Sequence, residues 1–381
     1  MSEMSGIYRA TYLLLVLSAS WLELGLENSL SQECEPIADQ NVASEPLRAM
    51  RAAMLGESEM TQPRLEALKS EGFNTLVFQL REVGVSDVKR LRNHLSLARH
   101  YGFEIGFWVE VARCKPIADL HPEWMASLQT HDEWRRYYPK SPSTKPNEVT
   151  KTYPWVPILS KETFEAQSKR VLDLLDQLPR AEYIFLNDLQ GAPSACGCGN
   201  DLCRWTSDYG DRRTTIPIGE EAAAKFVLRI QDAFKLSEVI PIWTTECEER
   251  DGHPSGQCAG VGCFNGICWK SYNRQLTPLS LNCGRIGVLT LQNTFQRALP
   301  ANSSMNSWLE YAISTFQTVP EKYGGEAIPP RRLITVIEGW GTSKERIDEQ
   351  LKANAEVGTN GYIIAYEEID QSWLPKVVKW K

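Results

Sequence analysis

The chain has 381 residues, a net charge of −7 and an isoelectric point near 5.5. Hydrophobic residues make up 42% and charged residues 23% of the sequence, which is typical of a folded globular protein and excludes an intrinsically disordered chain. The sequence contains no block of Lys and Arg, so we expect no nucleic-acid partner.

The first 26 residues are typical of an export signal. Arg9 precedes an apolar run at 12–17, and Ser18 and Ser20 supply the small residues of a cleavage site. The run is short for a membrane span. The alternatives are an uncleaved anchor, which would be the only link to a membrane, and a buried N-terminal helix. We therefore expect a secreted or periplasmic protein, in which residues 27–45 form a polar linker.

From residue 46 onward, short apolar runs alternate with segments of helical periodicity. The runs predict strands at 50–55, 75–80, 105–111, 183–186, 239–244, 286–291, 333–337 and 361–366. Apolar residues at helical spacing predict helices at 63–73, 85–102, 162–178, 220–235, 306–319 and 343–358. Continuously apolar strands that alternate with helices indicate a parallel sheet covered on both faces.

Eight such units predict an α/β fold of the (β/α)₈ (TIM) barrel type over residues 46–381. A doubly wound open sheet is the alternative, although no Gly-x-Gly-x-x-Gly follows the first strand to support its nucleotide-binding form. Two connections, from Cys114 to about Lys161 and from Thr245 to about Cys283, are too long for plain loops. Both follow strand ends, so we expect them on the catalytic face of the barrel.

Polar residues stand at the ends of most predicted strands, where barrel enzymes carry their chemistry. They are Arg81, Glu110, Asn187, Asp188, Glu246, Gln292, Asn293, Glu338 and Glu367. A buried carboxylate is costly unless it is paired or used. Several carboxylates at one end of a barrel therefore indicate either a catalytic site or a salt-bridged rim.

Two carboxylates on either side of a bond are the requirement for glycoside hydrolysis. Asp188 and Glu338 come from strands on different sides of the predicted barrel, and we expect Asp188 to be the acid/base and Glu338 the nucleophile. The other polar residues are expected to bind sugar hydroxyls or to hold the carboxylates, and Trp340 to stack on a sugar ring, although core packing is the common role of a single Trp.

An acid after Asn187 on the fourth strand and Glu338 at the end of the seventh resemble the large clan of (β/α)₈ retaining glycosidases. The resemblance implies the same acid/base and nucleophile, except that Asp188 stands where the clan has Glu and is one methylene shorter. His121-Pro122-Glu123-Trp124 and Cys196-Gly-Cys198 with Cys203-Arg204 also resemble a group of glycoside-hydrolase-like proteins. The resemblance covers roughly residues 46–370 in architecture, although few motifs carry it.

Ten cysteines fall mainly in the loops after the third, fourth and fifth strands. Cys196, Cys198 and Cys203 with Cys114 supply the four soft ligands that a structural zinc ion needs. Some zinc-bearing β-galactosidases resemble this chain in drawing four cysteines from these two loops, although the last gap here is two residues longer. In an exported protein the alternative is a set of disulfides, which is also the simpler reading of the cysteine loop after the fifth strand.

These patterns predict a glycoside hydrolase-like enzyme that acts on an oligosaccharide or polysaccharide, with no cofactor for catalysis and a structural zinc ion as an option. Two rival functions remain open. One is a carbohydrate-binding barrel without catalysis, and the other is a metal-dependent hydrolase that uses the cysteine and histidine loops.

Overall fold

The computed structural model describes residues 48–80, 85–125, 127–128, 149–158, 160–189, 212–245, 266–267, 284–295, 305, 307–322, 327–369 and 376–380. The chain divides into two compact units, Met1–Leu47 and Arg48–Lys381, and every described residue belongs to the second unit. No helix within these ranges is long and apolar enough to cross a membrane.

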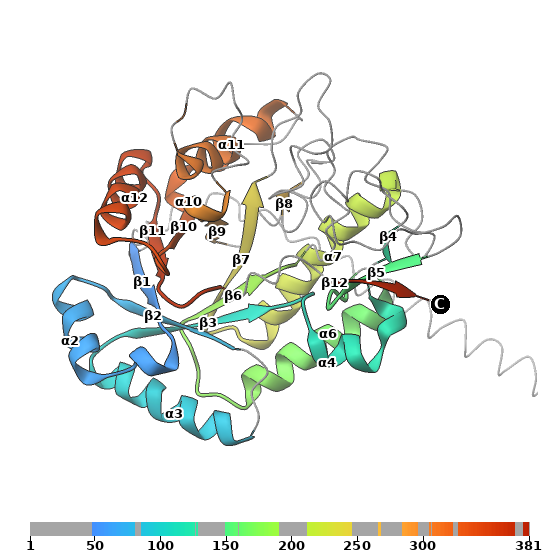
Figure 1. Cartoon of the computed structure of the whole chain (residues 1–381), viewed down its shortest axis with the longest axis horizontal. Coiled ribbons are helices and arrows are strands. Elements are labelled where there is room, and N and C mark those ends of the chain that lie inside the picture. Colours follow the sequence, from blue (N-terminus) through green and yellow to red (C-terminus); the bar gives the residue numbers. More distant parts are fainter. Residues whose placement is uncertain are drawn as a thin grey trace, which may run out of the picture. The chain divides into compact units, whose positions relative to one another are not determined.

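A closed barrel of parallel strands forms the centre of this unit (Figure 1). In order around the barrel the strands are β1 (Met50–Met54), β2 (Thr75–Gln79), β3 (Glu104–Glu110), β6 (Tyr183–Asn187), β7 (Glu238–Thr245), β9 (Ile286–Leu289), β10 (Leu333–Glu338) and β11 (Gly361–Ala365). The β1–β11 pair closes the ring, with Met50 opposite Gly361. The predicted (β/α)₈ barrel is therefore confirmed, and the open doubly wound alternative is wrong.

Helices follow the strands and cover the outside of the barrel. They are α2 (Gln62–Ser70), α3 (Val85–His100), α6 (Lys161–Asp176), α7 (Arg212–Ala233), α11 (Trp308–Lys322) and α12 (Lys344–Val357), with a short α10 (Gln292–Phe295) after β9. Single 3₁₀ turns lie at Glu57–Glu59, Pro122–Trp124 and Pro330–Arg332. The helix predicted to start at residue 220 begins at Arg212. Pro217 and Gly219 have low helix propensity, so the first turns of this helix were not predicted from the sequence.

Local signals explain where two of these helices begin and end. The Ser160 hydroxyl accepts a hydrogen bond from the Thr163 N–H at 3.2 Å and begins α6. The Ser343 hydroxyl caps α12 in the same way, and Gly358 ends α12 in a left-handed conformation with φ 73°.

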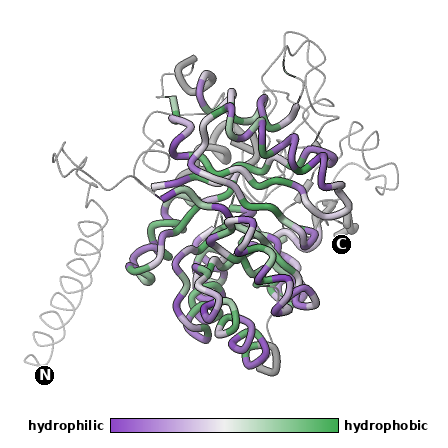
Figure 2. Tube along the Cα trace, turned by 90° about the vertical axis from the view of Figure 1, so that its left-hand side faces the viewer, coloured by the Kyte–Doolittle hydropathy of each residue, from purple (hydrophilic) through white to green (hydrophobic). Residues whose placement is uncertain are grey.

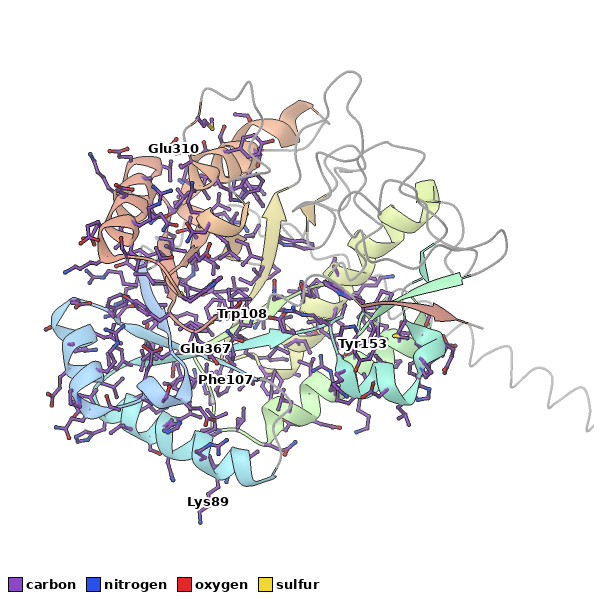
Figure 3. The ribbon with its side chains drawn as sticks, viewed as in Figure 1. Lys89, Phe107, Trp108, Tyr153, Glu310 and Glu367 are labelled. Carbon is purple, nitrogen blue, oxygen red and sulfur yellow. The ribbon has the colours of Figure 1, made fainter. Side chains whose placement is uncertain are left out.

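The strands are hydrophobic on both faces, as expected for a parallel sheet enclosed by helices. Figure 2 shows hydrophobic residues along the strands and hydrophilic residues along the outer helices. Two glycines make room for large neighbours, because a Cβ on Gly106 would lie 2.6 Å from the Phe185 ring and one on Gly287 would lie 2.1 Å from Ile242 Cδ1. Side chains such as Trp108 and Phe185, which are 1% and 0% exposed, fill the core. In Figure 3, Phe107 and Trp108 lie inside the molecule, whereas Lys89 projects outward.

The long connection after β3 carries a small sheet of its own. It contains α4 (Lys115–Leu120), β4 (Ser127–Leu128) and β5 (Val149–Tyr153), and β5 also pairs antiparallel with β12 (Lys376–Trp380). The hydroxyl of Tyr153, labelled in Figure 3, donates to Asp119 of α4 at 2.9 Å. The chain after β5 then returns to the barrel, where Trp155 forms a bridge with Arg113.

The N-terminal end of the barrel is closed by an ion-pair network. Arg285, which is 3% exposed, binds both carboxylate oxygens of Glu238, from its Nε at 3.0 Å and from a terminal nitrogen at 2.5 Å. The guanidinium also donates to Asn360 Oδ1 at 3.1 Å and lies 5.1 Å from the centre of the Tyr183 ring. This network ties β6, β7 and the starts of β9 and β11 together.

Candidate functional site

The C-terminal ends of β3 and β6 bring two acidic side chains together. Glu110 is paired with Asn187 in the sheet, and backbone hydrogen bonds continue past the strands from Val111 N–H to the Asn187 carbonyl and from Ala112 N–H to the Asp188 carbonyl. Asp188 has a left-handed backbone with φ 56°, a conformation that Asp tolerates better than most residues. The pairing of the two strand ends therefore fixes Asp188 beside Glu110.

Both carboxylate oxygens of Glu110 accept hydrogen bonds. Trp108 Nε1–H donates to Oε1 at 2.9 Å, and Asn187 Nδ2–H donates to Oε2 at 2.9 Å. A terminal nitrogen of Arg113 lies 3.3 Å from Oε1. The Glu110 side chain is 19% exposed, so one part of it still faces solvent.

Asp188 is more deeply buried than Glu110 and binds the same arginine. Its side chain is 1% exposed, and Arg113 Nε lies 3.2 Å from Asp188 Oδ2. Arg113 thus contacts carboxylate oxygens from two different strands.

The electrostatics of Glu110 combine two opposing effects. Burial raises the pKa of its carboxyl, and the charge of Arg113 together with the surrounding hydrogen bonds lowers it. The balance leaves the pKa of Glu110 below its ordinary value of 4.5. Glu110 is therefore an ionised carboxylate at neutral pH.

Helix α6 holds the backbone that carries this pair. Arg170 donates from one terminal nitrogen to the carbonyl oxygens of Glu110 and Val111, at 2.7 and 3.0 Å. Arg170 Nε also donates to the side-chain oxygen of the buried Gln167, whose amide nitrogen donates to the Val156 carbonyl at 3.1 Å. A polar row on one helix thus fixes the end of β3 and the segment after β5.

Glu338 ends β10 and is the second predicted catalytic residue. It is 4% exposed, and its Oε2 accepts a hydrogen bond from the backbone N–H of Asn293 at 2.9 Å. Asn293 Nδ2 donates to the Thr342 hydroxyl at 3.0 Å, which links α10 to the loop after β10. The turn after Glu338 is tight, since a Cβ on Gly339 would lie 2.9 Å from the Ala365 carbonyl oxygen.

The remaining predicted site residues have separate surroundings. The side-chain oxygen of Gln292 accepts the Trp308 N–H at 3.0 Å and so caps α11. Trp340 is half-buried and packs against the core. Glu367 is half-buried and lies over Gly56, while its backbone N–H donates to the Met54 carbonyl.

Several predicted residues lie outside the described ranges, namely Arg81, Glu246, Cys196, Cys198 and Cys203. Cys114 is 3% exposed at the start of α4. No cluster of three or more potential His, Cys, Asp or Glu ligands for a metal ion occurs among the residues that the structure describes. The zinc site therefore stays a prediction.

The sequence argument missed Arg113, Trp108 and Arg170. Arg113 follows Glu110 by three residues, but a strand end carries no periodic signal that marks an arginine as buried. Trp108 lies two residues before Glu110, and side chains at this spacing share one face of a strand. That spacing was the one signal available for a Trp–Glu hydrogen bond.

Comparisons with known proteins found similarity only to solved structures, at low sequence identity. No known protein family and no curated protein matches the sequence. Among solved structures, a β-galactosidase from the psychrophilic Marinomonas ef1 is 9% identical, with a TM-score of 0.46 over 83% of this chain and 54% of the other. An α-L-fucosidase isoenzyme 2 from Paenibacillus thiaminolyticus is 11% identical, with a TM-score of 0.43 over 85% of this chain and 47% of the other. The chain thus spans about half the length of these two proteins.

A structure of D-psicose 3-epimerase from Clostridium cellulolyticum H10 is similar at the same low level. It is 11% identical, with a TM-score of 0.38 over 83% of this chain and 84% of the other. Because one fold hosts many reactions, the reaction has to be argued from the residues.

Proposed function

We propose that the protein is an exported glycoside hydrolase that cleaves an oligosaccharide or polysaccharide with Asp188 and Glu338. The observation that carries this proposal is the placement of two nearly inaccessible carboxyl groups at the C-terminal ends of β6 and β10 in a closed barrel. Burial of a carboxyl group lowers the stability of the fold, so two buried carboxyl groups indicate a role other than stabilisation. Barrel enzymes place their reacting groups at this end of the strands.

In the proposed reaction, Asp188 donates its proton to the glycosidic oxygen while the bond from that oxygen to the anomeric carbon breaks. The bonding electrons stay with the oxygen, which leaves as a hydroxyl group. The Glu338 carboxylate forms a bond to the anomeric carbon, and water later displaces it after giving a proton back to Asp188. Asn293 supports this role of Glu338, because its backbone N–H holds Glu338 Oε2.

The test is a panel of oligosaccharides and polysaccharides, with release of reducing ends as the measurement. We expect Asp188→Asn and Glu338→Gln each to lower the rate on the best substrate by about 10²–10⁴-fold. Glu104→Gln is the matched control, because Glu104 lies at the opposite end of β3 and binds Arg48 there. Equal rates for the wild type and both site variants would remove Asp188 and Glu338 from the reaction.

A second candidate function is a carbohydrate-binding barrel without catalysis. The observation in its favour is the ion pair of Asp188 with Arg113, in which Asp188 is 1% exposed. Calorimetric binding of a glycan that the wild type leaves intact would support this candidate. Glycan hydrolysis by the wild type, with loss in the two site variants, would exclude it.

A further inference from the structure

Arg113 connects the two acidic side chains at the ends of β3 and β6. Its Nε lies 3.2 Å from Asp188 Oδ2, and one of its terminal nitrogens lies 3.3 Å from Glu110 Oε1. The arginine side chain is 5% exposed. A guanidinium is planar and directs its N–H groups in a rigid fork, so it restricts the directions of the carboxyl groups that it contacts. The position of the Asp188 carboxyl is therefore tied to that of Arg113.

The backbone on either side of Arg113 is held by the segment that follows β5. Cys114 N–H donates to the Pro154 carbonyl at 3.1 Å. The Ala112 carbonyl accepts a hydrogen bond from Val156 N–H at 2.8 Å. The same stretch is hydrogen-bonded on its other side to the backbone that continues β6. Arg113 thus extends from a stretch of chain that is held on two sides, which limits the places that its side chain can reach.

Glu110 provides a second fixed point for the guanidinium. Trp108 Nε1–H donates to Glu110 Oε1 and Asn187 Nδ2–H donates to Oε2, both at 2.9 Å. These two neutral donors orient the carboxylate. The carboxylate in turn restrains the guanidinium, because their opposite charges lie close together in a site that is largely screened from water. A chain of contacts therefore runs from Glu110 through Arg113 to Asp188.

We propose that Arg113 is a positioning residue that holds the carboxyl group of Asp188 at the place from which it gives its proton to the glycosidic oxygen. This inference rests on the proposed function, because it names the residue that orients the acid of that reaction. Proton transfer needs the acid within about 2.6–3.2 Å of the reacting oxygen, and a misplacement of about 1 Å can lower a rate by about 10²-fold. Arg113 also stabilises the carboxylate that Asp188 becomes once the proton has left.

The first test compares two glycosides of the sugar that the wild type cleaves best, one with an alkyl and one with a dinitrophenyl leaving group. An alkoxide leaves only with a proton from the acid, whereas dinitrophenolate is stable enough to leave without one. We expect Arg113→Met to lower kcat/KM by about 10²-fold on the alkyl glycoside and by less than about threefold on the dinitrophenyl glycoside. A merely structural role lowers both values equally, and an equal loss would overturn the inference.

Three reference variants accompany this test. Asp188→Asn should show the same dependence on the leaving group, whereas Glu338→Gln should lose both activities, because both substrates need the nucleophile. Arg285→Met is the matched control, since it removes a buried arginine from the other end of the barrel and should keep the wild-type ratio of the two rates. Arg113→Lys keeps the charge without the planar fork. It should lose about tenfold on the alkyl glycoside alone, and it carries the test if Arg113→Met does not fold.

The second test needs no substrate. Crystal structures of the wild type and of Arg113→Met are compared, and we expect the Asp188 carboxyl group to move by about 1 Å or more, while β6 stays in place. An Asp188 carboxyl group that keeps its wild-type position would overturn the inference, whether or not the protein cleaves a glycan.

The two tests separate this inference from the proposed function. A wild type that cleaves no glycoside, with an Asp188 carboxyl group that moves in Arg113→Met, would contradict the hydrolase and leave the positioning of Asp188 by Arg113 standing. Hydrolysis that depends on Asp188, with equal losses on both glycosides in Arg113→Met, would leave the hydrolase standing and overturn the inference.

Discussion

The two ends of the barrel contain buried arginines in contrasting surroundings. At the N-terminal end, Arg285 forms an ion pair with one carboxylate of the described part of the chain, that of Glu238. At the C-terminal end, Arg113 meets two carboxyl groups, those of Glu110 and Asp188. Among the described residues, the N-terminal arginine thus contacts one carboxyl group and the C-terminal arginine contacts two.

This difference separates two uses of buried charge. An ion pair with two well-directed hydrogen bonds holds strands in register, and it has a structural role without any part in a reaction. A buried carboxyl group costs stability, and ionisable groups in such surroundings are common at functional sites. We therefore expect the largest losses of stability from substitutions at the N-terminal end, and smaller losses, one of them pH-dependent, from substitutions at the C-terminal end.

The largest stability effect is expected from Gly361→Ala at the N-terminal end. Gly361 has φ 144°, and an added Cβ would lie 2.0 Å from the Met50 carbonyl oxygen, which is backbone and has no side-chain freedom to move. We expect the free energy of unfolding to fall by about 4 kcal/mol, as measured by chemical denaturation. Gly341→Ala is the matched control at the C-terminal end, because its φ of 59° is strained but no atom lies within 4 Å. A similar loss for both glycines would contradict the steric explanation.

The next effect is expected from Arg285→Met. Glu238 would lose its bidentate partner while remaining three-quarters buried, so we expect a loss of about 3 kcal/mol in unfolding free energy. The rate per folded molecule on any substrate should stay at the wild-type value. Arg48→Met, which removes an arginine that is 68% exposed, should cost less than about 0.5 kcal/mol. Loss of activity in well-folded Arg285→Met would contradict the purely structural role of the N-terminal end.

A smaller effect, which depends on pH, is expected from Glu110→Gln at the C-terminal end. The folded-state pKa of Glu110 lies below 4.5, so its ionised form stabilises the protein above that pH, and this contribution is lost as the pH falls through the folded-state pKa. At neutral pH the variant should be less stable by about 2 kcal/mol, the value of a hydrogen bond to a charged group. Unfolding curves at a series of pH values should show the difference shrinking below pH 4.5. A constant difference at all pH values would contradict the lowered pKa.

The smallest effect is expected from Ser343→Ala. The Ser343 hydroxyl caps α12 after β10, near Glu338 in the chain, and its loss should cost about 1 kcal/mol. Ser343→Gly should cost only a few tenths of a kcal/mol, because Gly is tolerated at this cap. Thermal unfolding of the two variants measures this order. The reverse order would show that the cap contributes through its backbone rather than its hydroxyl.

The sequence predicted the barrel well because a parallel strand buried on both faces is a continuous apolar run. The run at 183–186 and the observed β6 at Tyr183–Asn187 illustrate how closely the strands agree. The sequence also placed Asp188 and Glu338 at strand ends, where the structure has them. It failed at β5 and β12, because five-residue strands in antiparallel pairs carry no local mark of a distant partner.

The charge pattern of the site was beyond sequence reasoning for a related reason. Arg113 was unremarkable as a residue, and its importance comes from two carboxyl groups that belong to different strands. Asp188 was predicted as the acid/base at a strand end, and the structure has it 1% exposed beside Arg113, a contact that the sequence did not predict. Contacts of this kind depend on side-chain directions, and strand order alone does not give them.

The small sheet in the β3 connection has a consequence for how the protein is made. Strand β12 pairs with β5, which the ribosome produces about 220 residues earlier. The segment that continues β5 also forms the bridge from Trp155 to Arg113. The small sheet is therefore complete only after the residues of β12 have been synthesised, whereas the barrel strands and the Trp155–Arg113 bridge lie earlier in the chain.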